Sequence, residues 1–192
     1  MTALGTLDLG THTDVSGDTA LNGSDPVLEN IAGTDDADDV FDGTNSTHAG
    51  VCWFTLDAMP SDFGTMNTVD IRLRYGLLEA ANANLTWDSL QAQIRQSDGS
   101  TALTDTVTVA SNITDESPTN SSVTSMTNPD TTSGKAIWDD ARVYLTWNVT
   151  RNKGGHAAQE WQVYAAEITG DYDISTGPAG AVVFRHYRDQ KK

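Results

Sequence analysis

Hydrophobic and polar residues alternate along much of the chain, most clearly between residues 142 and 150. Every second residue there is Val, Leu or Trp, and the intervening residues are Arg, Tyr, Thr and Asn. A period of two places successive side chains on opposite faces of a β-strand. A second alternating run follows at residues 159–168, after a break that contains Gly-Gly. The two runs therefore predict an antiparallel hairpin with one buried face.

Further strand-like runs are separated by segments rich in Gly, Ser, Thr, Asn and Pro. They lie at residues 51–56, 68–78, 89–96, 106–109 and 123–126, with a last β-prone run at 181–184. Asp98-Gly99 is typical of a hairpin turn. A helix is the alternative for residues 86–96, with Thr86 as its cap and an apolar stripe from Trp87 to Ile94. About eight strands and no strong helix signal predict an all-β, antiparallel β-sandwich of jelly-roll type.

The chain of 192 residues, 38% of them hydrophobic, is long enough to bury one core. Residues 1–27 are rich in Gly, Thr and Asp with scattered apolar residues, which predicts an extended N-terminal arm. The sandwich is expected over residues 28–176. Pro178 follows it, and residues 177–192 are expected to form a C-terminal arm with a basic tail.

The charge is strongly acidic and unevenly distributed. The net charge is −16, whereas the last eight residues hold four of the eleven basic side chains. An acidic body repels phosphate backbones and anionic lipid, so neither nucleic acid nor a membrane is an expected partner. The basic tail could pair with an acidic surface, including that of a sister subunit, or remain a solvated terminus. Residues 1–31 lack a secretory signal pattern and Cys52 stands alone, so synthesis in a cytoplasm is expected.

The densest acidic segment, residues 35–43, is the best candidate for a metal site. Asp36, Asp38 and Asp42 could supply some of the oxygen ligands that Ca²⁺ needs. The EF-hand order fails, because Val40 stands where an acid is required and no Glu closes the loop. The alternative is a solvated acidic turn that discourages edge pairing. No other cofactor is expected.

Enzyme signatures are hard to find in this sequence. A nucleophile elbow, a phosphate-binding glycine loop and a zinc-protease motif are all missing, so we expect no enzyme activity. Five tryptophans raise the question of sugar binding, which uses exposed aromatic rings. Trp53, Trp147 and Trp161 lie within strand patterns and are expected in the core, whereas Trp87 and Trp138 lie at strand entries and are freer to be exposed.

The segments 138–147 and 163–172, with Lys153-Gly-Gly between them, resemble β-sandwich virion structural proteins of tailed bacteriophages, especially marine ones. Residues 69–74 and 90–96 are similar as well, so the resemblance covers about residues 28–173. It consists of a pattern of strands and turns, and no functional residue carries over from it.

The resemblance implies a capsid decoration (cement) protein that is made in the host cytoplasm and resides in the virion. Such a protein would bind the major capsid protein or other virion proteins, and it would form a homo-oligomer, most simply a trimer. A carbohydrate-binding sandwich associated with a tail fibre or head fibre is the alternative, which requires Trp87, Trp138 or Tyr144 to be exposed. A hydrolase acting on cell-wall sugar is a third hypothesis, which requires a cleft with two carboxylates.

Overall fold

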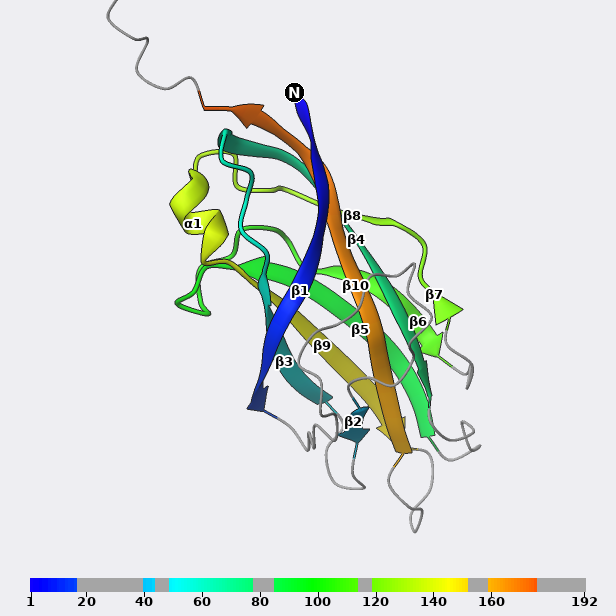
Figure 1. Cartoon of the computed structure of the whole chain (residues 1–192). Helices are drawn as coiled ribbons and strands as arrows, with labels where there is room; N and C mark the ends of the chain where they lie inside the picture. Colours follow the sequence, from blue (N-terminus) through cyan, green and yellow to red (C-terminus); the bar gives the residue numbers. More distant parts are fainter. Residues whose placement is uncertain (17–39, 44–48, 78–84, 114–118, 152–158, 176–192) are drawn as a thin grey trace, which may run out of the picture.

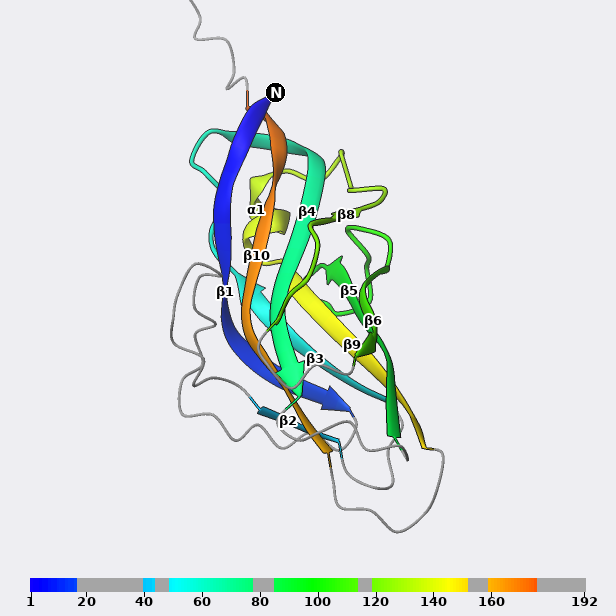
Figure 2. The same ribbon diagram turned by 90° about the vertical axis from the view of Figure 1, so that its right-hand side faces the viewer.

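The computed structural model describes residues 1–16, 40–43, 49–77, 85–113, 119–151 and 159–175. Within these ranges the chain forms antiparallel strands in two facing sheets, with one short helix (Figures 1 and 2). The predicted all-β sandwich is therefore confirmed. The jelly-roll connectivity stays a prediction.

Sheet one is built around two long strands, β4 (Phe63–Leu77) and β10 (Gln159–Ile174), which pair along nearly their whole length. Two short strands, β7 (Thr119–Asn120) and β8 (Thr124–Met126), pair with the far side of β4. On the other side of β10 lie β2 (Val40–Gly43) and the first half of β1 (Thr2–Ser16).

Sheet two has four further strands, in the order β6 (Val107–Ile113), β5 (Leu85–Arg95), β9 (Arg142–Arg151) and β3 (Ala49–Leu56). The second half of β1 completes this sheet beside β3. Figure 2 shows β1, β10 and β4 on one side of the molecule and β9, β5 and β6 on the other. The core lies between these two layers.

The first strand, β1, belongs to both sheets. Residues 2–8 pair with β10, and residues 9–16 pair with β3. Leu4 and Leu7 are buried in the core. The expected arm over residues 1–27 is thus corrected, because residues 2–16 form a strand of the sandwich. A register shift between Leu4 and Leu7 breaks the alternation that would have indicated it. Residues 17–27 and 177–192 lie outside the described residues.

The predicted hairpin between residues 142–150 and 159–168 is wrong. Both runs are strands, but β9 pairs with β3 and β5 in sheet two, whereas β10 pairs with β1, β2 and β4 in sheet one. A period of two shows which face of a strand is buried and leaves its neighbours undetermined. The two strands, although consecutive in the sequence, therefore lie in different sheets.

The remaining strand predictions within the described residues agree with the structure. Residues 85–95 form strand β5 and exclude the helical alternative. The Asp98-Gly99 turn joins β5 to β6, and Gly99 adopts a φ of 73°, which favours glycine. One short helix, α1 (Lys135–Asp139), was not predicted.

The core is filled by alternate residues of the long strands. In sheet one these are mainly residues of β4, and in sheet two mainly residues of β5 and β9. Fully buried side chains include Phe54, Met66, Ile71, Leu73, Leu90 and Trp138. Because every second residue of β9 faces this core, its intervening residues must lie on the outer surface of sheet two.

Candidate functional site

The outer face of sheet two carries the most distinctive group of side chains in the described part of the chain. On β9, Val143 and Leu145 face the core, so Arg142 and Tyr144 face outward. Strand register places Trp53 of β3 opposite Tyr144. On the other side of β9, Gln93 of β5 is also opposite Tyr144, and Arg95 is opposite Arg142. Residues from three strands thus meet on one surface.

Two arginine side chains lie over the two aromatic rings of this surface. The Arg142 guanidinium lies 4.0 Å from the centroid of the Trp53 ring, and that of Arg95 lies 4.6 Å from the centroid of the Tyr144 ring. Such cation–π contacts contribute about 0.5–1 kcal/mol each at exposed sites. They also restrict two otherwise flexible side chains. We define the Trp53–Tyr144 face by its outward residues: Val51, Trp53, Thr55, Gln91, Gln93, Arg95, Arg142, Tyr144 and Thr146.

Arg95 is held in place by polar contacts as well as by its ring. Its Nε donates to Oε1 of Gln93 at 2.7 Å, and its Nη1 donates to the carbonyl oxygen of Gly99 at 3.1 Å. Arg142 differs, because within the described ranges its guanidinium makes the stacking contact and no hydrogen bond. A guanidinium offers five N–H donors in a planar fork that matches a carboxylate. Arg142 is therefore a pre-positioned donor on this face.

The Asp98-Gly99 turn borders the face and packs against Tyr144. A Cβ atom at Gly99 would lie 2.6 Å from the Tyr144 hydroxyl oxygen, so a larger residue there would require Tyr144 to shift and would adopt an unfavourable positive φ. Asp98 accepts backbone N–H bonds from Ser100 and Thr101, both at 2.8 Å, and the hydroxyl of Thr101 at 2.7 Å. The contacts with Thr101, followed by those with Ser100, lower the pKa of Asp98 to about 2. The carboxylate of Asp98 thus accepts its hydrogen bonds from residues of its own turn.

The face is formed by three neighbouring strands, and no pocket is found in the described part of the molecule. Its outward residues include two arginines and no acid, although the whole chain carries a net charge of −16. Apart from Tyr144, these side chains are partly exposed. The arrangement suits contact with a carboxylate-bearing surface through charge-assisted hydrogen bonds.

The predicted calcium ligands are not brought together in the described residues. Asp36 and Asp38 lie outside the described ranges, whereas Asp42 is on β2, opposite Glu160 of β10. The ranges given above contain no group of three His, Cys, Asp or Glu residues that could hold a metal ion. The calcium site therefore stays a prediction.

The aromatic residues correct two expectations. Trp138 is fully buried rather than exposed, because α1 directs its ring against Phe63, with ring centroids 6.5 Å apart. Tyr144, at 5% exposure, is covered by Arg95 and the Gly99 turn. Two of the three aromatic residues that the carbohydrate-binding alternative could use are therefore buried.

The other tryptophans divide into three groups. Trp147 lies in the core, as predicted. Trp53 was also expected in the core, but it is partly exposed beneath Arg142. The side chains of Trp87, Trp161 and Cys52 lie outside the described residues.

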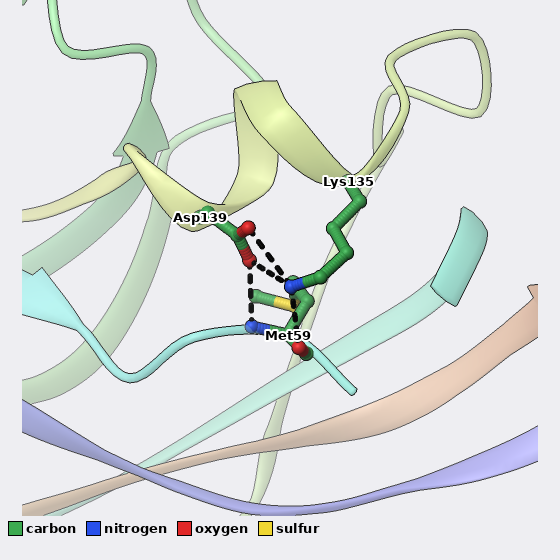
Figure 3. Close-up of polar contacts among 3 residues, drawn as sticks. All are labelled: Met59, Lys135 and Asp139. Atoms are coloured by element: carbon green, nitrogen blue, oxygen red, sulfur yellow. Dashed lines mark hydrogen bonds and ion pairs between the residues drawn. The ribbon is translucent and has the colours of Figure 1, made fainter. Parts of the chain in front are cut away.

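A second polar cluster fixes helix α1 to the loop before β4 (Figure 3). The carboxylate of Asp139 accepts the backbone N–H of Met59 at 2.8 Å. Lys135 Nζ donates to both carboxylate oxygens of Asp139, at 2.7 and 2.8 Å, and to the carbonyl oxygen of Met59 at 2.7 Å. These contacts satisfy backbone groups of a loop and position Trp138 over the core. Their role is structural.

Arg95 and Arg142 are not among the functional residues expected from the sequence. The alternating pattern offered a signal for Arg142, because it is one of the polar residues that alternate with apolar residues between positions 142 and 150. Nothing in the sequence shows that Trp53 lies opposite Tyr144, since that depends on the pairing of β3 with β9.

Comparisons with known proteins give little further information. No family model and no curated protein matches the chain. Among solved structures, the chain is similar to the arabinose-bound α-L-arabinofuranosidase MgGH51, with a TM-score of 0.45 and 8% sequence identity. The match covers 82% of this chain but only 23% of that chain. A likeness this distant carries no argument about activity. In addition, the described residues contain no helix with the length and hydropathy needed to cross a bilayer.

Proposed function

We propose that this chain is a structural protein of a bacteriophage virion that decorates the capsid and binds the coat and neighbouring copies through its surfaces. The observation that carries the proposal is the Trp53–Tyr144 face, where Arg142 and Arg95 are pre-positioned on one sheet of an otherwise acidic protein. Aromatic and arginine residues are enriched at protein–protein contacts.

The sequence pattern adds support, because its strands and turns resemble those of phage β-sandwich virion proteins. The basic tail would add a second contact with an acidic coat surface. A decoration protein of this kind acts by adhesion, so its binding depends on surface charge and on the rigidity of the sandwich. The trimeric state remains part of the proposal.

Quantitative mass spectrometry of purified particles tests the proposal. Particles would be isolated from a culture that expresses the chain from its native locus, and isotope-labelled peptides would give its copy number relative to the coat protein. Hundreds of copies per particle are expected. A dozen copies or fewer would instead place the chain at the tail or neck, and absence from particles would overturn a virion role altogether. An abundant host protein measured in parallel controls for contamination.

Removal of residues 177–192 tests the contribution of the basic tail. The truncated chain, added back to particles that lack the protein, should bind at lower occupancy than the full chain because four positive charges are lost. A circular dichroism spectrum equal to that of the full chain would show that the sandwich remains folded. Equal occupancy of the two chains would exclude the tail from coat binding.

A further inference from the structure

We infer that copies of this chain associate front to back, with the Trp53–Tyr144 face of one copy against the outer face of sheet one of the next. This inference deepens the proposed function, because it names the surfaces through which neighbouring copies meet. It rests on a difference in charge between the two outer surfaces of the sandwich.

The outer face of sheet one is acidic at one end. Ile71 of β4 and Ile168 of β10 face the core, so Asp70 and Asp171 face outward. Asp70 is opposite Thr169, which places Asp171 two residues further along the neighbouring strand. We call this end the Asp70–Asp171 end.

Within the described residues neither Asp70 nor Asp171 forms an ion pair, and the N-terminal amine of Met1 at this end lies 3.5 Å from a carboxylate oxygen of Asp173. Arg72 lies opposite Glu167, where opposite charges on neighbouring strands attract. Arg74 donates to the side chain of Asn120 at 3.4 Å, at the other end of the sheet. The carboxylate of Asp70 accepts a hydrogen bond from the hydroxyl of Ser125 at 2.6 Å.

The two surfaces have opposite character and lie on opposite sides of one molecule, because each is the outward layer of a two-layer sandwich (Figure 2). A two-fold contact between two Trp53–Tyr144 faces would bring four arginines together and would be repulsive. A front-to-back contact instead places Arg142 of one copy near Asp70 and Asp171 of the next. Such a contact uses two different patches, so it either closes into a ring or extends into a filament.

A second copy is a better occupant of the face than an unrelated ligand. The chain itself supplies 27 acidic residues at the same concentration as its arginines, and the Arg142 guanidinium has donors to spare within the described residues. Long-range attraction between the two faces would weaken with salt, since exposed charges are screened over about 8 Å at physiological ionic strength.

Sedimentation velocity of the purified full chain, at low and at high ionic strength, tests the inference. The parent chain should self-associate at low salt and dissociate as salt is added. Arg142→Glu and Asp171→Arg should each weaken self-association about tenfold. An equimolar mixture of the two variants should associate again, because the unaltered Trp53–Tyr144 face of the Asp171→Arg variant can bind the unaltered Asp70–Asp171 end of the Arg142→Glu variant. This recovery cannot arise from misfolded variants.

Asp140→Arg is the control for net charge, because it changes the charge as Asp171→Arg does at an exposed position outside the Asp70–Asp171 end, next to the Trp53–Tyr144 face. It should not weaken self-association. A monomeric parent chain, unaltered association of both face variants, or a mixture that fails to recover would overturn the inference. Retention on immobilised polygalacturonate without self-association would also overturn it, by assigning the face to an acidic polysaccharide. None of these results affects the copy number in particles, which tests the proposed function separately.

Discussion

The hydroxyl group of Tyr172 donates a hydrogen bond to a carboxylate oxygen of Asp62 at 2.8 Å, although 110 residues separate the two in the sequence. Asp62 lies just before β4 and Tyr172 lies near the end of β10. The ring of Tyr172 also stacks on Phe63, with ring centroids 5.4 Å apart. The pair therefore fixes the end of sheet one at which β4 begins and β10 ends.

Replacement of Tyr172 by Phe should lower the free energy of unfolding modestly, because it removes the hydrogen bond to Asp62 and keeps the ring packing on Phe63. The bond raises the pKa of Tyr172 above its ordinary value of 10.0. Its stabilisation is therefore complete below pH 10 and is lost as the pH rises through the folded-state pKa. Urea unfolding at neutral and at alkaline pH measures both effects. Equal stability of parent and variant at neutral pH would show that the bond contributes nothing.

Replacement of Gly170 by Ala should destabilise the chain by about 2 kcal/mol or more, because a Cβ atom there would lie 2.0 Å from the carbonyl oxygen of Thr68 on the neighbouring strand. Gly5→Ala is the matched control, since a Cβ atom at Gly5 meets nothing within 4 Å. The control should change stability by less than about 0.5 kcal/mol. Thermal unfolding compares the two variants, and similar losses in both would contradict the close approach at Gly170.

Replacement of Asp139 by Ala should cost about 1–3 kcal/mol, because the Met59 N–H loses its acceptor and Lys135 loses its ion pair. Most of this loss should come from the backbone N–H, since partly exposed ion pairs contribute little. The neighbouring Asp140→Ala variant, at an exposed position, should be nearly neutral. Denaturant titration distinguishes them. If Asp140→Ala costs as much as Asp139→Ala, the contacts in Figure 3 do not stabilise the loop.

The stability of the chain should fall as the pH drops from 3.8 to about 2. In this window the unfolded chain takes up protons at Asp98 and Asp130 while the folded chain does not, because hydrogen bonds in the folded chain lower both pKa values from 3.8 to about 2. For Asp130 the main cause is the hydroxyl of Ser133, followed by that of Thr132. A folded-state pKa below the unfolded value gives stabilisation that is present above pH 3.8 and lost on acidification.

The measurement is the melting temperature as a function of pH. Asp98→Asn and Asp130→Asn should each be less stable than the parent at neutral pH and should lose less stability on acidification. Parallel pH profiles for the parent and both variants would rule out this linkage.

The alternation of residues predicted where most strands lie, but it did not predict their partners. Residues 142–150 and 159–168 alternate because each buries one face, and that requirement is met equally well by strands in the same sheet or in facing sheets. The choice is made by neighbours far away in the sequence, such as β3 for β9 and β4 for β10.

The candidate site could not be predicted for the same reason. The Trp53–Tyr144 face requires three strands in a particular register, and a shift of one residue in β3 would turn Trp53 inward. Trp138 differs from its expectation in the opposite direction to Trp53, because it is buried although it was expected to be freer to be exposed. Its position at the entry of a strand suggested exposure, but a single turn of helix, held by Lys135 and Asp139, directs it into the core.

The strand β1 joins the two sheets near the beginning of the chain, and this has a consequence for how the protein folds. The first half of β1 pairs with β10, which is the last of the described strands. Residues more than 160 positions apart in the sequence must therefore come into contact before sheet one is complete. Loop closure over such distances is slow, and folding rates fall as the mean sequence separation of contacts rises. During synthesis, the edges of β1 and β4 remain open until β10 leaves the ribosome, and they are then the segments most exposed to aggregation.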